Sequence, residues 1–282
     1  MRVGILGDRE RATAWEKHLR PLTAVHEVVI AGNLDGLGHV DACLLIDESA
    51  DNLAQMAELI KLGIHSYLIS SLPTDHNQLK LIYHHSQESD VRIQFSHWPT
   101  ISPSSQYMRQ QIPKPSFLQV IKENSYISFT ENKTKFSSQW QDEIAWITRW
   151  MDMEIHRMDA HSLMTDQPEA GIQIHMKFEN GSAAAVTILN AGSENRHRRI
   201  ASGSGIMLDC HVERQSVRKI NLSGNDQSDH SVDRKTLDAS QTAPLSASLF
   251  FKAIKLRRDT GFSAYDALRA SRAIEKVKGQ IK

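Results

Sequence analysis

The chain opens with Met1-Arg2-Val3-Gly4-Ile5-Leu6-Gly7, a stretch that predicts a buried parallel strand running into a glycine turn. A helical pattern follows over residues 10–19. A strand, a glycine turn and a helix in this order are typical of a dinucleotide-binding domain, in which the pyrophosphate lies at the helix N-terminus. The opening therefore predicts a Rossmann-like fold.

The phosphate-binding turn departs from the usual pattern, Gly-x-Gly-x-x-Gly/Ala. The run here is Gly7-Asp8-Arg9-Glu10-Arg11-Ala12, so the first and last positions fit and Arg9 replaces the middle glycine. That glycine normally lets the pyrophosphate approach the backbone, and we expect the bulky Arg9 side chain to fill the site instead. Gly7, Asp8 and Arg9 are the candidate cofactor-binding residues of this turn.

The composition is typical of a globular protein with room for two domains. The 282 residues are 40% hydrophobic and 23% charged, with a formal net charge of +0. No global field attracts nucleic acid or anionic lipid, and neither a signal peptide nor a membrane-spanning apolar run is visible. We therefore expect a cytoplasmic protein without nucleic-acid or membrane partners. Cys43 and Cys210 lack zinc-ligand spacing, so free thiols and no metal site are predicted.

The predicted fold class is α/β followed by α+β, in two domains. Residues 1–112 alternate strand and helix patterns, which predicts a reduced, Rossmann-like parallel sheet. A cluster of prolines then places the boundary near Pro113. Residues 113–282 predict an open, mostly antiparallel sheet with helices. The expected strands of the first domain are 1–7, 26–31, 41–46, 65–70 and 91–95, with a short helix at 105–111 before the boundary.

The second domain begins with an extended segment, 117–130, and a helix, 139–151, that carries three tryptophans. Ile172, Ile174, Met176 and Phe178 alternate with polar residues and give one strand a dry face. A turn at Asn180-Gly181 leads to the next strand. Further strands are expected at 198–201, 206–212 and 216–222, a polar loop at 224–242, and closing helices at 245–257 and 263–278, the second capped by Ser263 and stopped by Gly279.

Four segments, in order and spacing, resemble the Gfo/Idh/MocA oxidoreductases over nearly the whole chain. They are Asp41-Ala42-Cys43-Leu44-Leu45-Ile46, like the family's Asp-Ala-Val strand; Gly63-Ile64-His65, like its Gly-Lys-His; the hairpin Phe178-Glu179-Asn180-Gly181-Ser182-Ala183; and the tail at 251–254 and 262–268. The resemblance implies an NAD(P)-dependent enzyme acting on sugars or polyols, with a lysine in Glu-Lys-Pro and an Asp/His pair as chemical groups. It also implies a homodimer through the second sheet, unless the dry face covers helices instead.

The catalytic positions of the family are altered. Ser70 and Ser71 stand where the lysine is expected, and serine offers no cation to act on a substrate hydroxyl. On the helix at 139–151, Trp146 stands where histidine is expected and Arg149 where a second acid often lies. Asp142 remains as a candidate substrate-pocket or catalytic acid, beside Glu143. Carboxylates near a helix start are more often solvated and paired with the helix dipole.

The cofactor positions are altered too. The family's Thr-Pro step near the dinucleotide is replaced by Asp47 and Glu48, and two carboxylates there would repel a diphosphate. Asn33 stands near the usual ribose-binding acid and is either a ribose ligand or a turn residue. The segment from Ala31 to Asp41 is too short for the helix and strand that normally support the adenosine. NAD(P) is thus implied by resemblance only, and we expect its normal binding to be lost.

Three further clusters have two interpretations each. His97-Trp98 follows the fifth strand, where an aromatic ring could stack on a sugar or pack inside the protein. The run 196–199 (Arg-His-Arg-Arg) could receive an anion or form a surface patch. His84-His85 could ligate a metal only with remote partners, and otherwise forms a solvated helix face.

Two functions compete. One is a degenerate descendant of the family, a pseudoenzyme that binds a small carbohydrate-like ligand or a protein partner. The other is an active NAD(P)-dependent oxidoreductase with altered catalytic groups. We favour the first, because the cofactor and catalytic positions are lost together.

Overall fold

The computed structural model describes residues 1–125, 136–163, 170–221 and 232–281. The chain forms two compact units, Met1–Ile101 with Ser240–Ser271, and Ser102–Ala239 with Arg272–Lys282. The sequence instead predicted a single boundary near Pro113, between residues 1–112 and 113–282. Residues 126–130 of the expected extended segment and residues 224–231 of the expected loop lie outside the described residues.

The first unit is built on a five-stranded sheet in the order β2-β1-β3-β4-β5, with every neighbouring pair parallel. This confirms the Rossmann-like sheet. Between β2 and β3 the chain forms only a single 3-10 turn, Asp35–Leu37, so the adenosine-side elements are missing as the short spacing predicted. The strands are β1 (Arg2–Gly7), β2 (Glu27–Ala31), β3 (Ala42–Ile46), β4 (His65–Ile69) and β5 (Ile93–Phe95).

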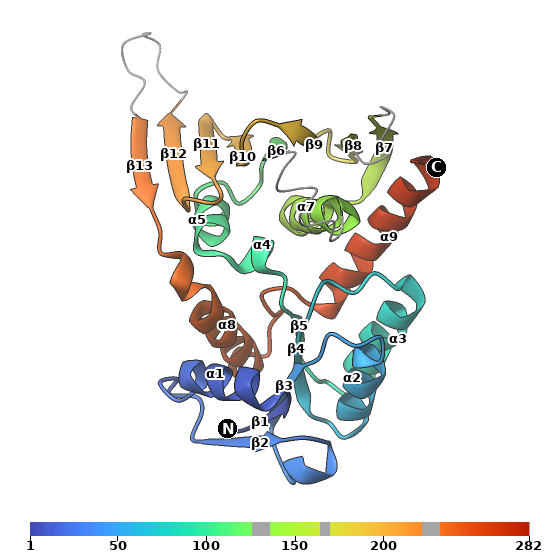
Figure 1. The fold of residues 1–282 in the computed structure, drawn as a ribbon, viewed down its shortest axis with the longest axis vertical. Helices are drawn as coiled ribbons and strands as arrows, with labels where there is room; N and C mark the ends of the chain where they lie inside the picture. Colours follow the sequence, from blue (N-terminus) through green and yellow to red (C-terminus); the bar gives the residue numbers. More distant parts are fainter. Residues whose placement is uncertain (126–135, 164–169, 222–231, 282) are drawn as a thin grey trace. The chain divides into compact units, whose positions relative to one another are not determined.

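Helices cover both faces of this sheet (Figure 1). α1 (Arg9–Leu19) and α8 (Thr242–Leu256) share one face and a buried apolar cluster with β1, β3 and β4. α2 (Asn52–Lys61) and α3 (His76–Glu88) lie on the other face, and α4 (Trp98–Ile101) follows β5. α8 is thus far from α1 in sequence but packs beside it on the same face of the sheet. Where α8 meets β4, the Tyr67 hydroxyl donates a hydrogen bond to Ser246 Oγ at 3.0 Å.

Gly7 fixes the turn between β1 and α1. Its φ is +134°, and a Cβ atom there would lie 2.3 Å from the carbonyl oxygen of Ile46. A side chain would therefore force β1 and β3 apart, because L residues rarely adopt this φ and real Cβ contacts are not so short. The first glycine of the turn is thus required by the fold itself, whatever the turn binds.

The second unit is built on an eight-stranded sheet in the order β13-β12-β11-β10-β6-β9-β8-β7, parallel at β6–β9 and antiparallel elsewhere. α5 (Pro103–Gln111) and α7 (Phe136–Met151) lie on one face (Figure 1). The dry face predicted on β8 is buried. The strands are β6 (Phe117–Ser125), β7 (Ile155–Ser162), β8 (Gly171–Phe178), β9 (Ala183–Gly192), β10 (Arg196–Gly203), β11 (Ile206–His211), β12 (Ser216–Asn221) and β13 (Val232–Thr236).

Two of these strands were not predicted. A register shift between Ile155 and Arg157 breaks the apolar alternation between Ile155 and Met158, and only Met158 and Ala160 of β7 are buried, which is too short a pattern to identify a strand. β13 falls inside the expected loop, and all five of its residues are exposed. An edge strand with no dry face carries no periodic signal, so the loop prediction was wrong at 232–236.

The last helix, α9 (Ala264–Gln280), begins as predicted and ends later. Ser263 Oγ accepts from the Asp266 amide at 3.2 Å, and Asp266 Oδ2 accepts from the Ser263 amide at 2.8 Å, a reciprocal cap. Gly279 lies inside the helix rather than stopping it. The next residue, Gln280, is held through side-chain bonds to the Ala160 amide and the Met158 carbonyl at 2.7 and 3.0 Å. No helix in the described parts of the chain is both long and apolar enough to cross a membrane.

Candidate functional site

The N-terminus of α1 is capped by its own chain. Asp8 precedes the helix, and its Oδ1 accepts hydrogen bonds from the amides of Glu10 and Arg11 at 3.1 and 2.9 Å. The first amides of a helix have no partner within the helix, and in a dinucleotide-binding domain they face the pyrophosphate. Here a side-chain carboxylate already uses two of them.

Arg9 is the first residue of α1, and its side chain is exposed. The arginine that pairs with a carboxylate at this end of the helix is Arg11, whose Nη2 lies 3.7 Å from Glu48 Oε1. Both side chains of this pair are about half exposed, at 47% and 49%. The ion pair near the phosphate turn is therefore made by Arg11, two residues after Arg9 on α1.

The two carboxylates after β3 are held by the loops around them. Asp47 accepts from the amide and hydroxyl of Ser49, both at 2.8 Å, and from Gln55 Nε2 at 3.1 Å. Glu48 Oε2 accepts from the Ser71 amide at 2.8 Å. Glu48 thus links the loops after β3 and β4 to α1, and it places a carboxylate beside the Asp8-capped helix end.

The remaining cofactor and lysine positions have structural partners. Asn33 Oδ1 accepts from the Gly36 amide at 3.0 Å, which favours the turn-residue interpretation. The Ser70 hydroxyl donates to the Ser71 carbonyl at 2.8 Å, while the Ser70 amide donates to Ser96 Oγ at 3.0 Å. These serines join the ends of β4 and β5 and supply no positive charge.

His97 and Trp98 differ in exposure. His97 is 3% exposed; its Nδ1 lies 2.8 Å from Thr100 Oγ1 and its ring 4.5 Å from the Phe262 ring, so it packs inside the first unit. Trp98 is 38% exposed and stacks on Trp15, with ring centroids 6.2 Å apart and planes 14° apart. Of the two, Trp98 is the one that presents an aromatic surface at the carboxyl end of the sheet.

In the second unit, α7 and β10 enclose a buried ion pair that the sequence analysis missed. Arg199 is 1% exposed, and its Nε and Nη2 donate to Glu143 Oε2 and Oε1 at 2.9 and 2.8 Å. Its guanidinium lies 4.6 Å over the Trp146 ring, and Trp146 Nε1 donates to Ser105 Oγ at 3.1 Å. Trp146, at the position where the family has histidine, therefore packs against this buried ion pair.

The charges of this cluster set the protonation of its neighbours. Burial opposes ionisation of Glu143, but Arg199 and His197 outweigh it and lower the Glu143 pKa. Burial lowers the pKa of His197, whose Nε2 lies 3.1 Å from Glu143 Oε1. Burial, followed by the charge of Glu143, raises the pKa of Asp142 to about 7. Asp142 is therefore able to exchange a proton near neutral pH. Arg149, at the other altered family position, is half-buried near the end of α7.

The arginines of the basic run 196–199 are paired with carboxylates. Arg196 pairs with Glu194, Arg198 donates to both oxygens of Asp209 at 3.1 and 2.9 Å, and Arg199 is held by Glu143. Each arginine of the run therefore has a carboxylate partner within the chain. Among the described residues no group of three or more His, Cys, Asp or Glu side chains could hold a metal ion, the pair at 84–85 included.

Comparison with solved structures gives a clear fold. The UDP-N-acetylglucosamine 3-dehydrogenase of Acidithiobacillus ferrooxidans matches with a TM-score of 0.79 and 14% identity over 99% of this chain and 97% of its own. An NAD-binding oxidoreductase of Klebsiella pneumoniae gives 0.82 and 12% over 100% and 97%. A levoglucosan dehydrogenase, solved with NADH and L-sorbose, gives 0.77 and 11% over 100% and 96%.

These neighbours are Gfo/Idh/MocA-type dehydrogenases, so the chain has the fold that the sequence resemblance predicted. No protein-family model matches the sequence, and no curated protein gives a significant match. The likeness at this level of identity concerns the fold, because one fold supports many activities.

Proposed function

We propose that this protein is a pseudoenzyme of the Gfo/Idh/MocA fold, without normal NAD(P)-dependent catalysis, which binds a small carbohydrate-like ligand or a protein partner. The observation that carries the proposal is the Asp8 cap on α1. A bound diphosphate would have to displace that carboxylate from the helix amides, and it would also lie near the carboxylate of Glu48. At about 4 Å and an effective dielectric constant of about 20, each such repulsion amounts to roughly 4 kcal/mol before screening.

The catalytic side supports the same proposal. Ser70 and Ser71 bind each other and the neighbouring strand end rather than presenting a cation, and Trp146 packs on Arg199 where the family places histidine. The residues present therefore do not fit NAD(P) or its usual proton relay, and no hydride-transfer step is assigned to them. Among the catalytic positions discussed above, Asp142 is the one whose side chain is suited to proton exchange. The exposed indole of Trp98 offers an aromatic surface of the kind on which sugar rings stack.

The test is titration of the purified protein with NADH and NADPH, followed by coenzyme fluorescence and by calorimetry. We expect no micromolar affinity. Micromolar binding would overturn the proposal and favour the alternative, an active NAD(P)-dependent oxidoreductase on a sugar or polyol.

A double variant sharpens this test. Asp8→Gly with Glu48→Gln removes both carboxylates and frees the α1 amides, and we expect it to bind NADH more tightly than the parent protein. Glu88→Gln, which removes an exposed carboxylate at the end of α3, is the matched control and should leave the affinity unchanged. Equal affinities in all three proteins would show that carboxylates do not block the site.

We further propose a cytoplasmic homodimer, paired through the face of the eight-stranded sheet opposite α5 and α7. Half-buried side chains from three adjacent strands, β6, β9 and β10, form the middle of that face. Sedimentation equilibrium should give twice the chain mass, and Ala185→Arg should reduce it to the monomer. A monomer in the parent protein would contradict the pairing. The residues concerned are Gln119, Ile121, Ala185, Thr187 and Ile200.

A further inference from the structure

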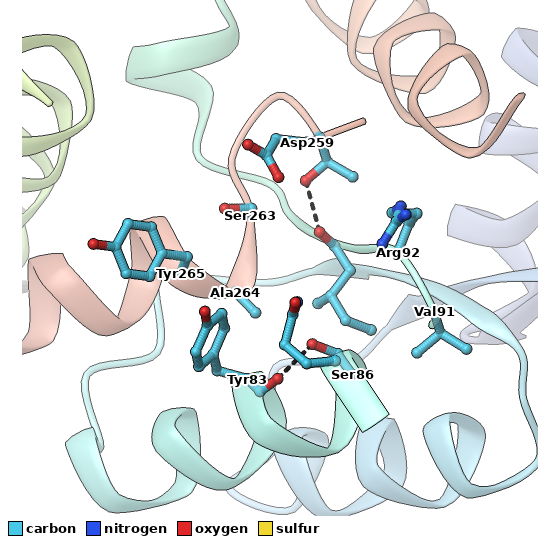
Figure 2. A pocket seen from close by; sticks show the side chains of 11 residues that line it. Tyr83, Ser86, Val91, Arg92, Asp259, Ser263, Ala264 and Tyr265 are labelled. Carbon is cyan, nitrogen blue, oxygen red and sulfur yellow. Dashed lines mark hydrogen bonds between the residues drawn. The ribbon is translucent and has the colours of Figure 1, made fainter. Parts of the chain in front are cut away.

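A hollow of ≈ 230 Å³ opens in the first unit at the amino end of β5 (Figure 2). It is lined by the last turns of α3, the residues leading into β5, and the connection from α8 into α9. Ligands of open α/β sheets usually bind at the carboxyl ends of the strands. This hollow therefore lies away from the Asp8, Glu48 and Trp98 positions described above.

Part of the lining of the hollow is aromatic and apolar. The rings of Tyr83 and Tyr265 lie 5.6 Å apart and meet on the same side in Figure 2. Val91, Ile93 and Ala264 line the hollow as buried apolar residues. A ligand with one apolar ring face would find an apolar surface here, and Tyr265, which is 44% exposed, leaves that surface accessible.

Polar side chains line the hollow as well. Among the described residues, the Asp259 carboxylate and the Gln87 carboxamide have no hydrogen bond or ion pair. The Arg92 guanidinium, which faces the tyrosines in Figure 2, pairs with Asp90 at 3.2 Å. Together these groups supply acceptors, donors and a forked cation to one small volume.

The other hydroxyls of the lining already have backbone partners. Thr260 Oγ1 donates to the Ile93 carbonyl at 2.6 Å, and Ser86 Oγ donates to the Tyr83 carbonyl at 2.7 Å, as the dashed lines in Figure 2 show. These bonds tie the α8–α9 connection to β5 and fix the last turns of α3. These two hydrogen bonds therefore hold this part of the lining in place.

The charges of the lining select a neutral ligand. The guanidinium of Arg92 is balanced by Asp90, and the free carboxylate of Asp259 would repel an anion such as a phosphate. The volume corresponds to roughly eight water molecules at about 30 Å³ each, and it lies below the usual range of about 300–1,000 Å³ for drug-sized ligands. A single ring with an apolar face and a hydroxylated edge meets both conditions.

We propose that this hollow binds a neutral monosaccharide or cyclic polyol, with Asp259, Gln87 and Arg92 contacting its hydroxyls and the tyrosines its apolar face. The proposal rests on the carbohydrate-like ligand of the proposed function, but it is independent of the loss of coenzyme binding. A ligand of this size, with about a dozen non-hydrogen atoms, is expected to have a dissociation constant on the order of 1 mM.

The experiment is an amide chemical-shift titration of the full chain with D-glucose, myo-inositol and N-acetylglucosamine in turn. We expect at least one probe to give saturable shifts over residues 83–93 and 259–265, with inorganic phosphate giving none. Asp259→Ala and Gln87→Ala should each weaken that binding tenfold or more. Their matched controls, Arg258→Ala and Glu88→Ala, change the exposed neighbours on the same elements and should leave it unchanged.

Trp98→Ala separates this site from the one suggested for the proposed function. Binding that survives Trp98→Ala and is lost in Asp259→Ala supports the hollow. Binding that is lost in Trp98→Ala and unchanged in Asp259→Ala overturns the hollow and leaves the proposed function standing. No saturable shift with any probe, or saturation by phosphate, also overturns it. The coenzyme titration reports on the proposed function separately.

Discussion

The end of α1 and the α7–β10 cluster make an instructive pair, because the family resemblance assigns the cofactor to the first and the catalytic groups to the second. At α1, Asp8 and Glu48 are satisfied by backbone amides and by an ion pair that is half exposed. In the second unit, Glu143 and Arg199 satisfy each other with almost no exposure. In both places the residues that differ from the family pattern have hydrogen-bond or ion-pair partners within their own chain.

The largest expected loss in the free energy of unfolding follows from breaking the buried pair of Glu143 and Arg199. Glu143→Ala leaves the Arg199 guanidinium buried without its carboxylate, so we expect the free energy of unfolding to fall by about 3–5 kcal/mol. Glu194→Ala, which breaks the exposed pair with Arg196, should leave it almost unchanged, because solvent screens that pair. Urea unfolding followed by circular dichroism measures both.

A double variant distinguishes the loss of charge pairing from a loss of packing. Replacing both partners, Glu143→Leu with Arg199→Met, leaves no unpaired buried charge and should recover most of the lost stability. If the double variant were as unstable as Glu143→Ala, the cluster would matter for its shape rather than for its charge pairing.

Asp142 gives the next largest effect, through pH. Its pKa is about 7 in the folded chain against an ordinary value of 3.8, so between these values the folded state holds a proton that the unfolded state has released. The contribution of Asp142 to stability is therefore largest at low pH and is lost as pH rises through 7, with a fall of about 2–3 kcal/mol between pH 5 and pH 8. Asp142→Asn should lack this fall, because the amide does not ionise.

The measurement is the free energy of unfolding of parent and variant at pH 5 and pH 8. The difference between the two proteins should grow with pH in favour of the variant. Asp51→Asn, at an exposed residue before α2, should follow the parent at both pH values. Parallel pH profiles for the parent and Asp142→Asn would mean that Asp142 titrates as an ordinary surface carboxylate.

The sequence predicted those elements that have a regular apolar period. β1, β3, β4 and β5 are buried over most of their length, and so is the dry face of β8, so apolar runs and apolar alternation were enough to locate them. β7 was missed because its register shift interrupts the period, and β13 because it is exposed throughout. The helical return of α8 to the first unit could not be predicted, because apolar spacing shows that a face is buried and not what covers it.

The site residues also divide into those that the local sequence predicts and those that depend on long-range contacts. A residue such as Asp8 just before a helical pattern is a recognisable cap, so its bond to the α1 amides was available from local sequence. The Glu143–Arg199 pair needed long-range information. Strand parity does place His197 and Arg199 on the same face as buried Ala201, which is a signal that β10 points an arginine inward. Nothing local identifies α7 as its partner.

The smallest effect belongs to the cap itself. Asp8→Ala removes two hydrogen bonds to the α1 amides, and we expect a loss of about 1 kcal/mol in the free energy of unfolding. Asp8→Ser keeps a capping oxygen without the charge and should recover most of that loss, whereas Glu48→Gln, in a half-exposed pair, should stay within about 1 kcal/mol of the parent. A loss as large as that of Glu143→Ala would mean that the α1 end is as integral to the fold as the buried pair. The contrast between an exposed cap on α1 and a buried ion pair on α7 would then fail, and with it the reason to expect that removing carboxylates alone increases coenzyme binding at the turn.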